Sequence, residues 1–114
     1  MTHVTKMLAD FAVQLKYSDL PFEVVETTKS YILDFYAASF AGLKVNRDFN
    51  QIIEELFFEA GGKEEASVLC STKRLPVGNA AFLNAAYAHG ADMDDGNRKA
   101  MGHVAAHVMA TVFA

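Results

Sequence analysis

The sequence of 114 residues has a single cysteine, two prolines, no tryptophan and no long apolar run. Cys70 has no second cysteine with which to form an internal disulfide or a metal-binding pair, which fits a reducing compartment and an inert thiol. No stretch reaches the roughly 18 uninterrupted apolar residues of a membrane span. Asp10 and other polar residues also lie where a signal peptide needs its apolar core. These absences predict a cytoplasmic protein without membrane contact.

Positive charge is also scarce, with 10 lysines and arginines against 14 aspartates and glutamates and a net charge of -4. No basic stripe is present of the kind that binding to a phosphate backbone requires, so nucleic acid is not an expected partner. Hydrophobic residues make up 52% of the chain, which is enough for folding. The length allows one domain at most, over residues 1–114.

Apolar residues recur mainly at three- and four-residue spacing, which is typical of helices with one packed face. The spacing predicts helices over about 4–16, 21–43 and 47–60, with a cap at 18–21 and a stop at Gly61. A fourth helix is expected from Val77 to about Gly90, with Phe82 among its inward residues, and a fifth from His103. The polar segment near 66–75 is predicted to be extended or a small hairpin. The expected fold class is therefore an all-α bundle of about five helices with one short extended segment.

Charged and proton-transferring groups concentrate between the last two predicted helices. His89, Asp92, Asp94 and Asp95 fall within seven positions, and His103 follows. Holding three carboxylates together costs free energy unless another group compensates them, so this cluster is the candidate site.

Several segments, in order along the chain, resemble one known family. The most specific is Ala88 to Asp95 followed by Ala100 to His103, which looks like a His-x-x-Asp-aromatic-Asp-Asp segment and a later Gly-His pair. By these segments the chain resembles the MmgE/PrpD family, which includes 2-methylcitrate dehydratases, cis-aconitate decarboxylases and iminodisuccinate epimerases. The other matching segments are Leu8 to Ala12, Tyr17 to Pro21, Val24-Val25, Ile32 to Asp34, Ala38 to Gly42, Gly61-Gly62, Glu65 to Leu69 and Asn79 to Asn84.

The resemblance implies a fold larger than this chain, namely a helical domain and a smaller α/β lid with the active site between them. The chain would be the N-terminal part of that helical domain, and the remaining catalytic residues would lie beyond Ala114. Asp92 and His103 match positions used in catalysis. His89 and Gly96 are the candidate substrate-binding positions. The resemblance further implies a homodimer or self-association, a small polycarboxylate substrate and no required cofactor or metal.

The chemistry of such substrates explains the residue types. Moving a proton at a carbon next to a carboxylate requires a positioned acid and base, and cations to hold the carboxylates. His103 can donate or accept a proton near neutral pH, and Asp92 can orient or exchange one. The sequence departs from the family pattern at Gly96, where a hydroxyl residue is common, at Asn97 instead of histidine and at Val104 instead of proline. These departures predict either a different substrate preference or a paralogue with altered or lost activity.

Structural roles are the alternatives for several of these residues. Asp94 and Asp95 are interpreted first as turn caps that bind backbone amides, and His89 as a partner of a backbone carbonyl at a helix end. A hydrated divalent ion held by Asp92, Asp94 and Asp95 remains open. The spacing excludes a calcium-binding EF-hand loop, because Gly96 and His103 occupy its fifth and twelfth positions. His103 and a histidine one turn later lack an evident third zinc ligand.

Two functions therefore remain. In the first, the chain is the N-terminal part of a lyase or isomerase, inactive and prone to self-association when alone. In the second, it is a stand-alone helical interaction or scaffold module without catalysis. The two differ in what covers the apolar stripe of the last helix, which consists of Val104, Val108, Met109, Val112 and Phe113.

Overall fold

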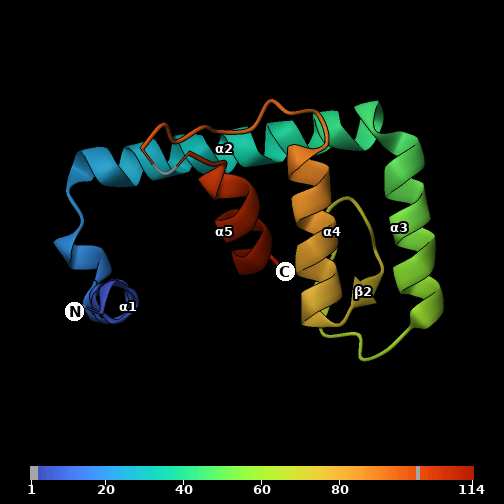
Figure 1. Ribbon diagram of the computed structural model, residues 1–114, viewed down its shortest axis with the longest axis horizontal. Coiled ribbons are helices and arrows are strands. Elements are labelled where there is room, and N and C mark those ends of the chain that lie inside the picture. Colours follow the sequence, from blue (N-terminus) through green and yellow to red (C-terminus); the bar gives the residue numbers. More distant parts are fainter. Residues whose placement is uncertain (1–2, 100) are drawn as a thin grey trace.

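The computed structural model describes residues 3–99 and 101–114. In them the chain forms five α-helices, one short 3-10 helix and a two-stranded antiparallel hairpin, which confirms the predicted fold class. Figure 1 shows their arrangement. The elements are α1 (Val4–Gln14), η1 (Tyr17–Asp19), α2 (Phe22–Val45), α3 (Arg47–Ala60), β1 (Ala66–Ser67), β2 (Arg74–Leu75), α4 (Val77–His89) and α5 (Val104–Val112).

The long helix α2 is the spine of the molecule. The helices α3, α4 and α5 extend from the same side of α2, and α1 stands apart near the other end (Figure 1). The buried residues of α2 lie in its second half and include Phe35, Ala38 and Gly42, while its first half is mostly exposed. The second half of α2 is therefore the part of this helix that packs against α4 and α5.

The helices α2 and α4 cross at two glycines. A Cβ atom on Gly42 would lie 1.9 Å from the backbone oxygen of Tyr87, and one on Gly90 would lie 3.2 Å from the Cα of Gly42. Asn50 of α3 donates from its amide to the carbonyl oxygen of Gly42 at 3.0 Å, which caps a carbonyl near the end of α2. This crossing fixes the position of His89, which immediately precedes Gly90 in the chain.

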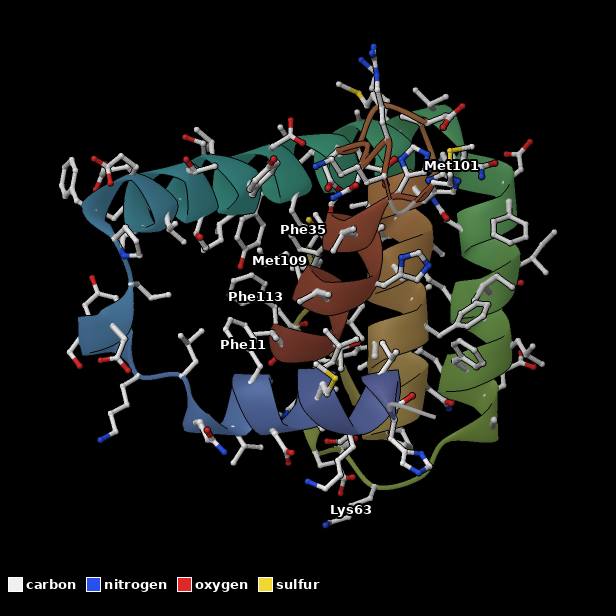
Figure 2. The ribbon with its side chains drawn as sticks, turned by 60° about the vertical axis from the view of Figure 1, so that its left-hand side comes forward. Phe11, Phe35, Lys63, Met101, Met109 and Phe113 are labelled. Atoms are coloured by element: carbon white, nitrogen blue, oxygen red, sulfur yellow. The ribbon has the colours of Figure 1, made fainter. Side chains whose placement is uncertain are left out.

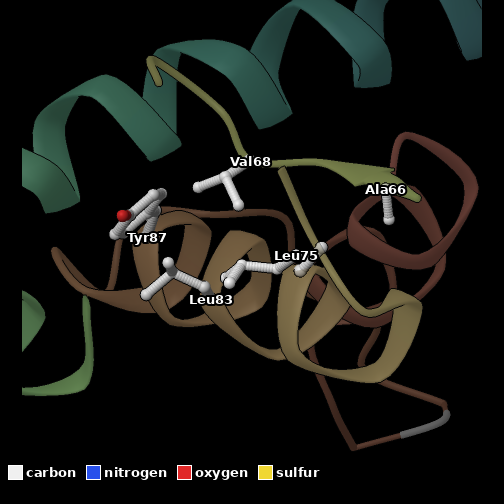
Figure 3. Packing of buried hydrophobic residues seen from close by; sticks show 6 residues of the cluster. Ala66, Val68, Leu75, Leu83 and Tyr87 are labelled. Carbon is white, nitrogen blue, oxygen red and sulfur yellow. The ribbon is translucent and has the colours of Figure 1, made fainter. Parts of the chain in front are cut away.

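One core cluster joins the hairpin to α4. Figure 3 shows Val68, Leu83 and Tyr87 packed together. Asn84 is fully buried beside them, and its side chain accepts a hydrogen bond from the Leu69 amide at 2.8 Å and donates to the Ser67 carbonyl at 3.1 Å. The side chain of Asn84 thus provides the hydrogen bonds that a neighbouring strand would otherwise provide to the backbone of this short extended segment.

A second cluster joins α5 to α2 and α4. Ala106 and Ala110 of α5 pack against Phe35 and Ala88, and the small side chains permit a close approach of the three helices. Figure 2 shows Phe35 of α2 beside Met109 of α5 and Phe113, which follows α5. The rings of Phe35 and Phe113 are stacked, with centroids 6.0 Å apart. This cluster holds the start of α5, and with it His103, next to the end of α4.

Several local expectations differ from the structure. The predicted cap at 18–21 is absent, because Ser18 and Asp19 form the turn η1 and Pro21 precedes α2 without a side-chain hydrogen bond to its amides. Phe82 was expected to face inward but is 54% exposed. The last-helix stripe is divided, since Met109 and Phe113 pack inward whereas Val104, Val108 and Val112 are exposed. Helical spacing predicts a face but not whether another element covers it.

No helix among the described residues combines the length and the apolar character that crossing a membrane would require.

Candidate active site

The candidate site lies where two helix ends meet. His89 is the last residue of α4, His103 is the residue that precedes the first turn of α5, and the loop between them runs along α2 (Figure 1). The loop folds back on itself through an antiparallel bridge in which the Asn97 amide donates to the Gly102 carbonyl at 2.9 Å. The sequence therefore brings the two histidines together by closing a loop over the crossing of α2 and α4.

Asp94 faces the Nδ1 atoms of both imidazole rings. Its side chain is only 1% exposed, and its Oδ1 is 3.1 Å from Nδ1 of His89. Its Oδ2 is 3.4 Å from Nδ1 of His103. The second contact is within ion-pair distance but lacks hydrogen-bond geometry, so Nδ1 of His103 is buried without a hydrogen-bond partner in the described part of the chain. The ring centroids of His89 and His103 are 4.8 Å apart, in an edge-to-face arrangement.

Asp92 completes the cluster from the loop. One side-chain nitrogen or oxygen of each of His89, Asp92, Asp94 and His103 falls within 4.8 Å of the others. Asp92 is exposed and has a positive φ of 49°, a left-handed conformation that aspartate tolerates better than most residues. The two residues predicted to be catalytic are thus close together, and the histidine predicted to bind substrate is beside them.

Asp95 has a different position from its neighbours. Its Oδ1 accepts a hydrogen bond from the backbone amide of Ala105 at 2.8 Å, which satisfies an unpaired donor in the first turn of α5. This is the capping role that the sequence suggested for Asp95. The Asp95 carboxylate is not among the four side chains that converge. Those four are two aspartates and two histidines, rather than the three aspartates that the sequence offered as ligands of a divalent ion.

Nitrogen and oxygen donors of this kind also suit a divalent metal ion, and imidazole with carboxylate is a common set for transition metals. The spacing of the four side chains would allow it. Both Nδ1 atoms face Asp94, so a metal ion held by the histidines would be ligated through their Nε2 atoms, with Asp94 orienting the two rings.

Gly96 lies in the exposed part of the loop. A Cβ atom added there would have no neighbour within 4 Å, and the residue is not among those with positive φ. The backbone at this position would therefore accept a residue with a side chain. Its place among the substrate-binding residues rests on the sequence resemblance alone.

A cavity of about 610 Å³ adjoins the histidine pair. His107, which the sequence argument considered only as a zinc partner, lines this cavity and donates from Nδ1 to the backbone carbonyl of His103 at 2.6 Å. The lining combines these imidazoles with apolar side chains. It also includes Asn46, Phe49, Phe82, Ala85, Ala86, His89, Gly90, Gly102, His103 and Ala106.

A larger hollow of about 1090 Å³ lies between α2, α3 and residues 70–73 and contains none of the four clustered side chains. Cys70 lines it, and partial burial raises the pKa of the Cys70 thiol. A raised pKa reduces the thiolate fraction at neutral pH, in agreement with the inert thiol that the sequence predicted. The smaller cavity is the one that His89 and His103 line.

Comparisons with known proteins identify the family of the chain. The MmgE/PrpD N-terminal domain matches residues 6–114, and the chain belongs to this family. Two relatives, both cis-aconitate decarboxylases of Aspergillus terreus, one from strain NIH 2624 / FGSC A1156, are each 30% identical to it over 111 residues. The alignments cover 97% of this chain but only 22% of each relative. No solved structure matches the chain significantly.

Proposed function

We propose that the chain is the N-terminal part of a lyase or isomerase of the MmgE/PrpD family that acts on a small polycarboxylate. The observation that carries this proposal is the convergence of Asp92 and His103, within a family-matched sequence, beside a cavity of about 610 Å³. The relatives' name specifies decarboxylation of cis-aconitate. Dehydration of 2-methylcitrate and epimerisation of iminodisuccinate are the other reactions to test.

The two residues have separate roles in the proposed reaction. His103 borders the cavity with an imidazole, which suits the transfer of a proton to or from a carbon next to a carboxylate. Asp92 is close enough to exchange or orient a proton within the cluster. His89, which also lines the cavity, and Gly96 are proposed to lie near the bound substrate.

The charges needed to hold a polycarboxylate are not in this cavity. The lining supplies histidines and one asparagine but, among the described residues, no lysine or arginine. Cations are needed to compensate the substrate carboxylates and to stabilise charge in the transition state. We therefore propose that the rest of a longer polypeptide supplies them, together with a lid.

The large accessible surface and large radius of gyration of the chain support the same proposal. The accessible surface is 8268 Å², whereas a compact monomer of 12.5 kDa exposes about 6,200 Å². Its radius of gyration is 15.8 Å, against about 13 Å for a compact domain of about 100 residues. Residues 1–114 are on this proposal part of a larger helical domain in a cytoplasmic homodimer that needs no cofactor.

The test is turnover by the complete polypeptide that contains this sequence. Each of cis-aconitate, 2-methylcitrate and iminodisuccinate would be incubated with it and the products identified by NMR. His103→Asn and Asp92→Asn should each lower kcat by about 10²–10⁴-fold, the usual contribution of a positioned acid or base. His3→Gln, an exposed histidine that precedes α1, is the matched control and should leave kcat unchanged.

Absence of turnover for all three substrates would contradict the proposed function. A stop codon directly after Ala114 in the source gene would favour the interaction module instead.

A further inference from the structure

We infer that Asp94 is a positioning residue that orients His89 and His103 together through their Nδ1 atoms, which leaves Nε2 of each ring as its proton-transfer atom. The use of these atoms in a reaction rests on the function proposed above. The orientation itself is a property of the folded chain and is tested separately.

Burial is the first step of the argument. The Asp94 side chain is 1% exposed, so its charge is removed from water, and an ionised carboxylate in such a place needs compensating partners. The polar groups beside it are the Nδ1 atoms of His89, at 3.1 Å from Oδ1 and 3.3 Å from Oδ2, and of His103, at 3.4 Å from Oδ2. Oδ1 therefore has one imidazole nitrogen within reach, and Oδ2 has two.

Hydrogen-bond chemistry then determines the tautomer. An ionised carboxylate only accepts hydrogen bonds, so an imidazole nitrogen that faces it must carry the proton. The proton on Nδ1 of a neutral ring leaves Nε2 unprotonated and basic. The hydrogen bond to Asp94 thus fixes the tautomer of His89, and we infer the same tautomer for His103, whose Nδ1 also faces the carboxylate.

The contact to His103 lacks hydrogen-bond geometry. Its Nδ1 is buried and has no hydrogen bond among the described residues, and Oδ2 of Asp94 lies within ion-pair distance of it at 3.4 Å. Hydrogen bonds of catalytic groups are often long or poorly aligned before substrate binds and improve afterwards. We expect the His103 contact to shorten in this way.

The neighbouring aspartates do not share this role. Asp95 is committed to the backbone amide of Ala105, and Asp92 is exposed on the loop. Although the three aspartates are close in sequence, only Asp94 is buried and faces the Nδ1 atoms of both rings. Asp94 therefore orients the two histidines instead of capping a turn, the role that its place in the sequence first suggested.

The variant Asp94→Asn separates positioning from packing, because asparagine has nearly the same shape as aspartate. It offers one acceptor oxygen instead of two, and its amide nitrogen donates. A ring facing that nitrogen must present an unprotonated Nδ1 and so carry its proton on Nε2. We therefore expect one of His89 and His103 to change tautomer.

The measurement is the ¹⁵N NMR spectrum of the histidine rings at about pH 8.5, where an ordinary imidazole is neutral, in the presence of EDTA. In the unmodified chain His89 and His103 should carry the proton on Nδ1. His107 should do so in every variant, because its Nδ1 donates to the His103 carbonyl, and it serves as the internal reference. Asp95→Asn is the matched control, since it retains an oxygen for the Ala105 amide and should change neither ring.

A spectrum of the unmodified chain with the His103 proton on Nε2 would overturn the inference, and this measurement needs no variant to fold. Unchanged tautomers in folded Asp94→Asn would overturn it as well. Recovery of the Nδ1–H form in Asp94→Glu, which restores the second acceptor oxygen, would support it.

Activity provides a second readout in the complete polypeptide. Asp94→Asn should lower kcat by about 10⁴-fold, as the same change does in the serine-protease triad, while KM changes little because Asp94 does not face the cavity. Unchanged kcat would overturn the inference. If the tautomers change as expected but no substrate is turned over, the proposed function fails and the positioning role stands.

Discussion

At the scale of single residues, the structure depends on polar side chains that replace missing backbone partners. Asn84 is the clearest case, because one buried amide satisfies both the Leu69 amide and the Ser67 carbonyl. The strands β1 and β2 are too short to provide these hydrogen bonds themselves. The extended segment is therefore held to α4 by a side chain rather than by a sheet.

We predict that Asn84→Ala lowers the free energy of unfolding by about 1–3 kcal/mol, because it removes two partly buried hydrogen bonds and leaves the Leu69 amide and the Ser67 carbonyl without them. Urea denaturation followed by circular dichroism measures the change. Gln51→Ala is the control, since it removes an exposed side chain that bonds only Glu55 within α3. The control should change stability by less than about 0.5 kcal/mol, and an equal loss in both variants would contradict the prediction.

Gly96 gives a second prediction at this scale. Because an added Cβ has open space around it, Gly96→Thr should change the free energy of unfolding by no more than about 0.5 kcal/mol. In the complete polypeptide the introduced hydroxyl should change the relative kcat/KM of the three candidate substrates. A large loss of stability would show that the loop requires glycine for another reason, and unchanged relative kcat/KM would place Gly96 away from the substrate.

At the scale of secondary-structure elements, the crossing of α2 and α4 determines where the site forms. The two helices approach so closely that the Gly42 position has no room for a methyl group. His89 immediately precedes this crossing, and α5 brings His103 against it through the alanines that pack on Ala88 and Phe35. The geometry of the histidine pair is thus a consequence of helix packing.

Gly42→Ala should lower the free energy of unfolding by about 3 kcal/mol or more, since the obstacle is the Tyr87 backbone and cannot rotate away. It should also change the His89 and His103 ring signals in NMR spectra. Gly78→Ala, in the first turn of α4 where an added Cβ has no neighbour within 4 Å, is the matched control. Its stability should be unchanged or higher by up to about 1 kcal/mol. An equal free energy of unfolding in the two variants would contradict the conclusion that the helices need a glycine at this crossing.

At the scale of the whole molecule, much apolar surface has no partner within the described residues. No residue of α1 is buried, although its apolar residues follow helical spacing. The exposed apolar residues at the two ends of the chain include Val4, Met7, Leu8, Phe11, Val104, Val108 and Val112. A contiguous apolar surface usually marks an interface, and we expect these residues to contribute to one.

We predict that the chain alone associates with itself at micromolar concentration and turns over none of the three substrates. Size-exclusion chromatography with light scattering measures the association. Phe11→Glu and Val112→Lys, which change exposed residues, should shift the mass toward that of a monomer without unfolding the chain. A chain that stays monomeric, or that is active alone, would contradict the prediction.

The sequence by itself determined the helices, the position of the hairpin, the family and the segment that carries the candidate site. These properties depend on local periodicity, on stop signals such as Gly61 and on residue patterns that remain recognisable along a single chain. Membership of Asp92 and His103 in one cluster could also be anticipated, because a short loop joins them.

Only the tertiary structure decided which aspartate faces both histidines and which one caps α5, because residues adjacent in sequence can point in opposite directions in a loop. It also decided that Phe82 and the whole of α1 are exposed, since helical spacing does not show whether a neighbouring element covers a face. The cavity beside His103 arises in the same way, from the packing of α4 and α5 against α2 and α3.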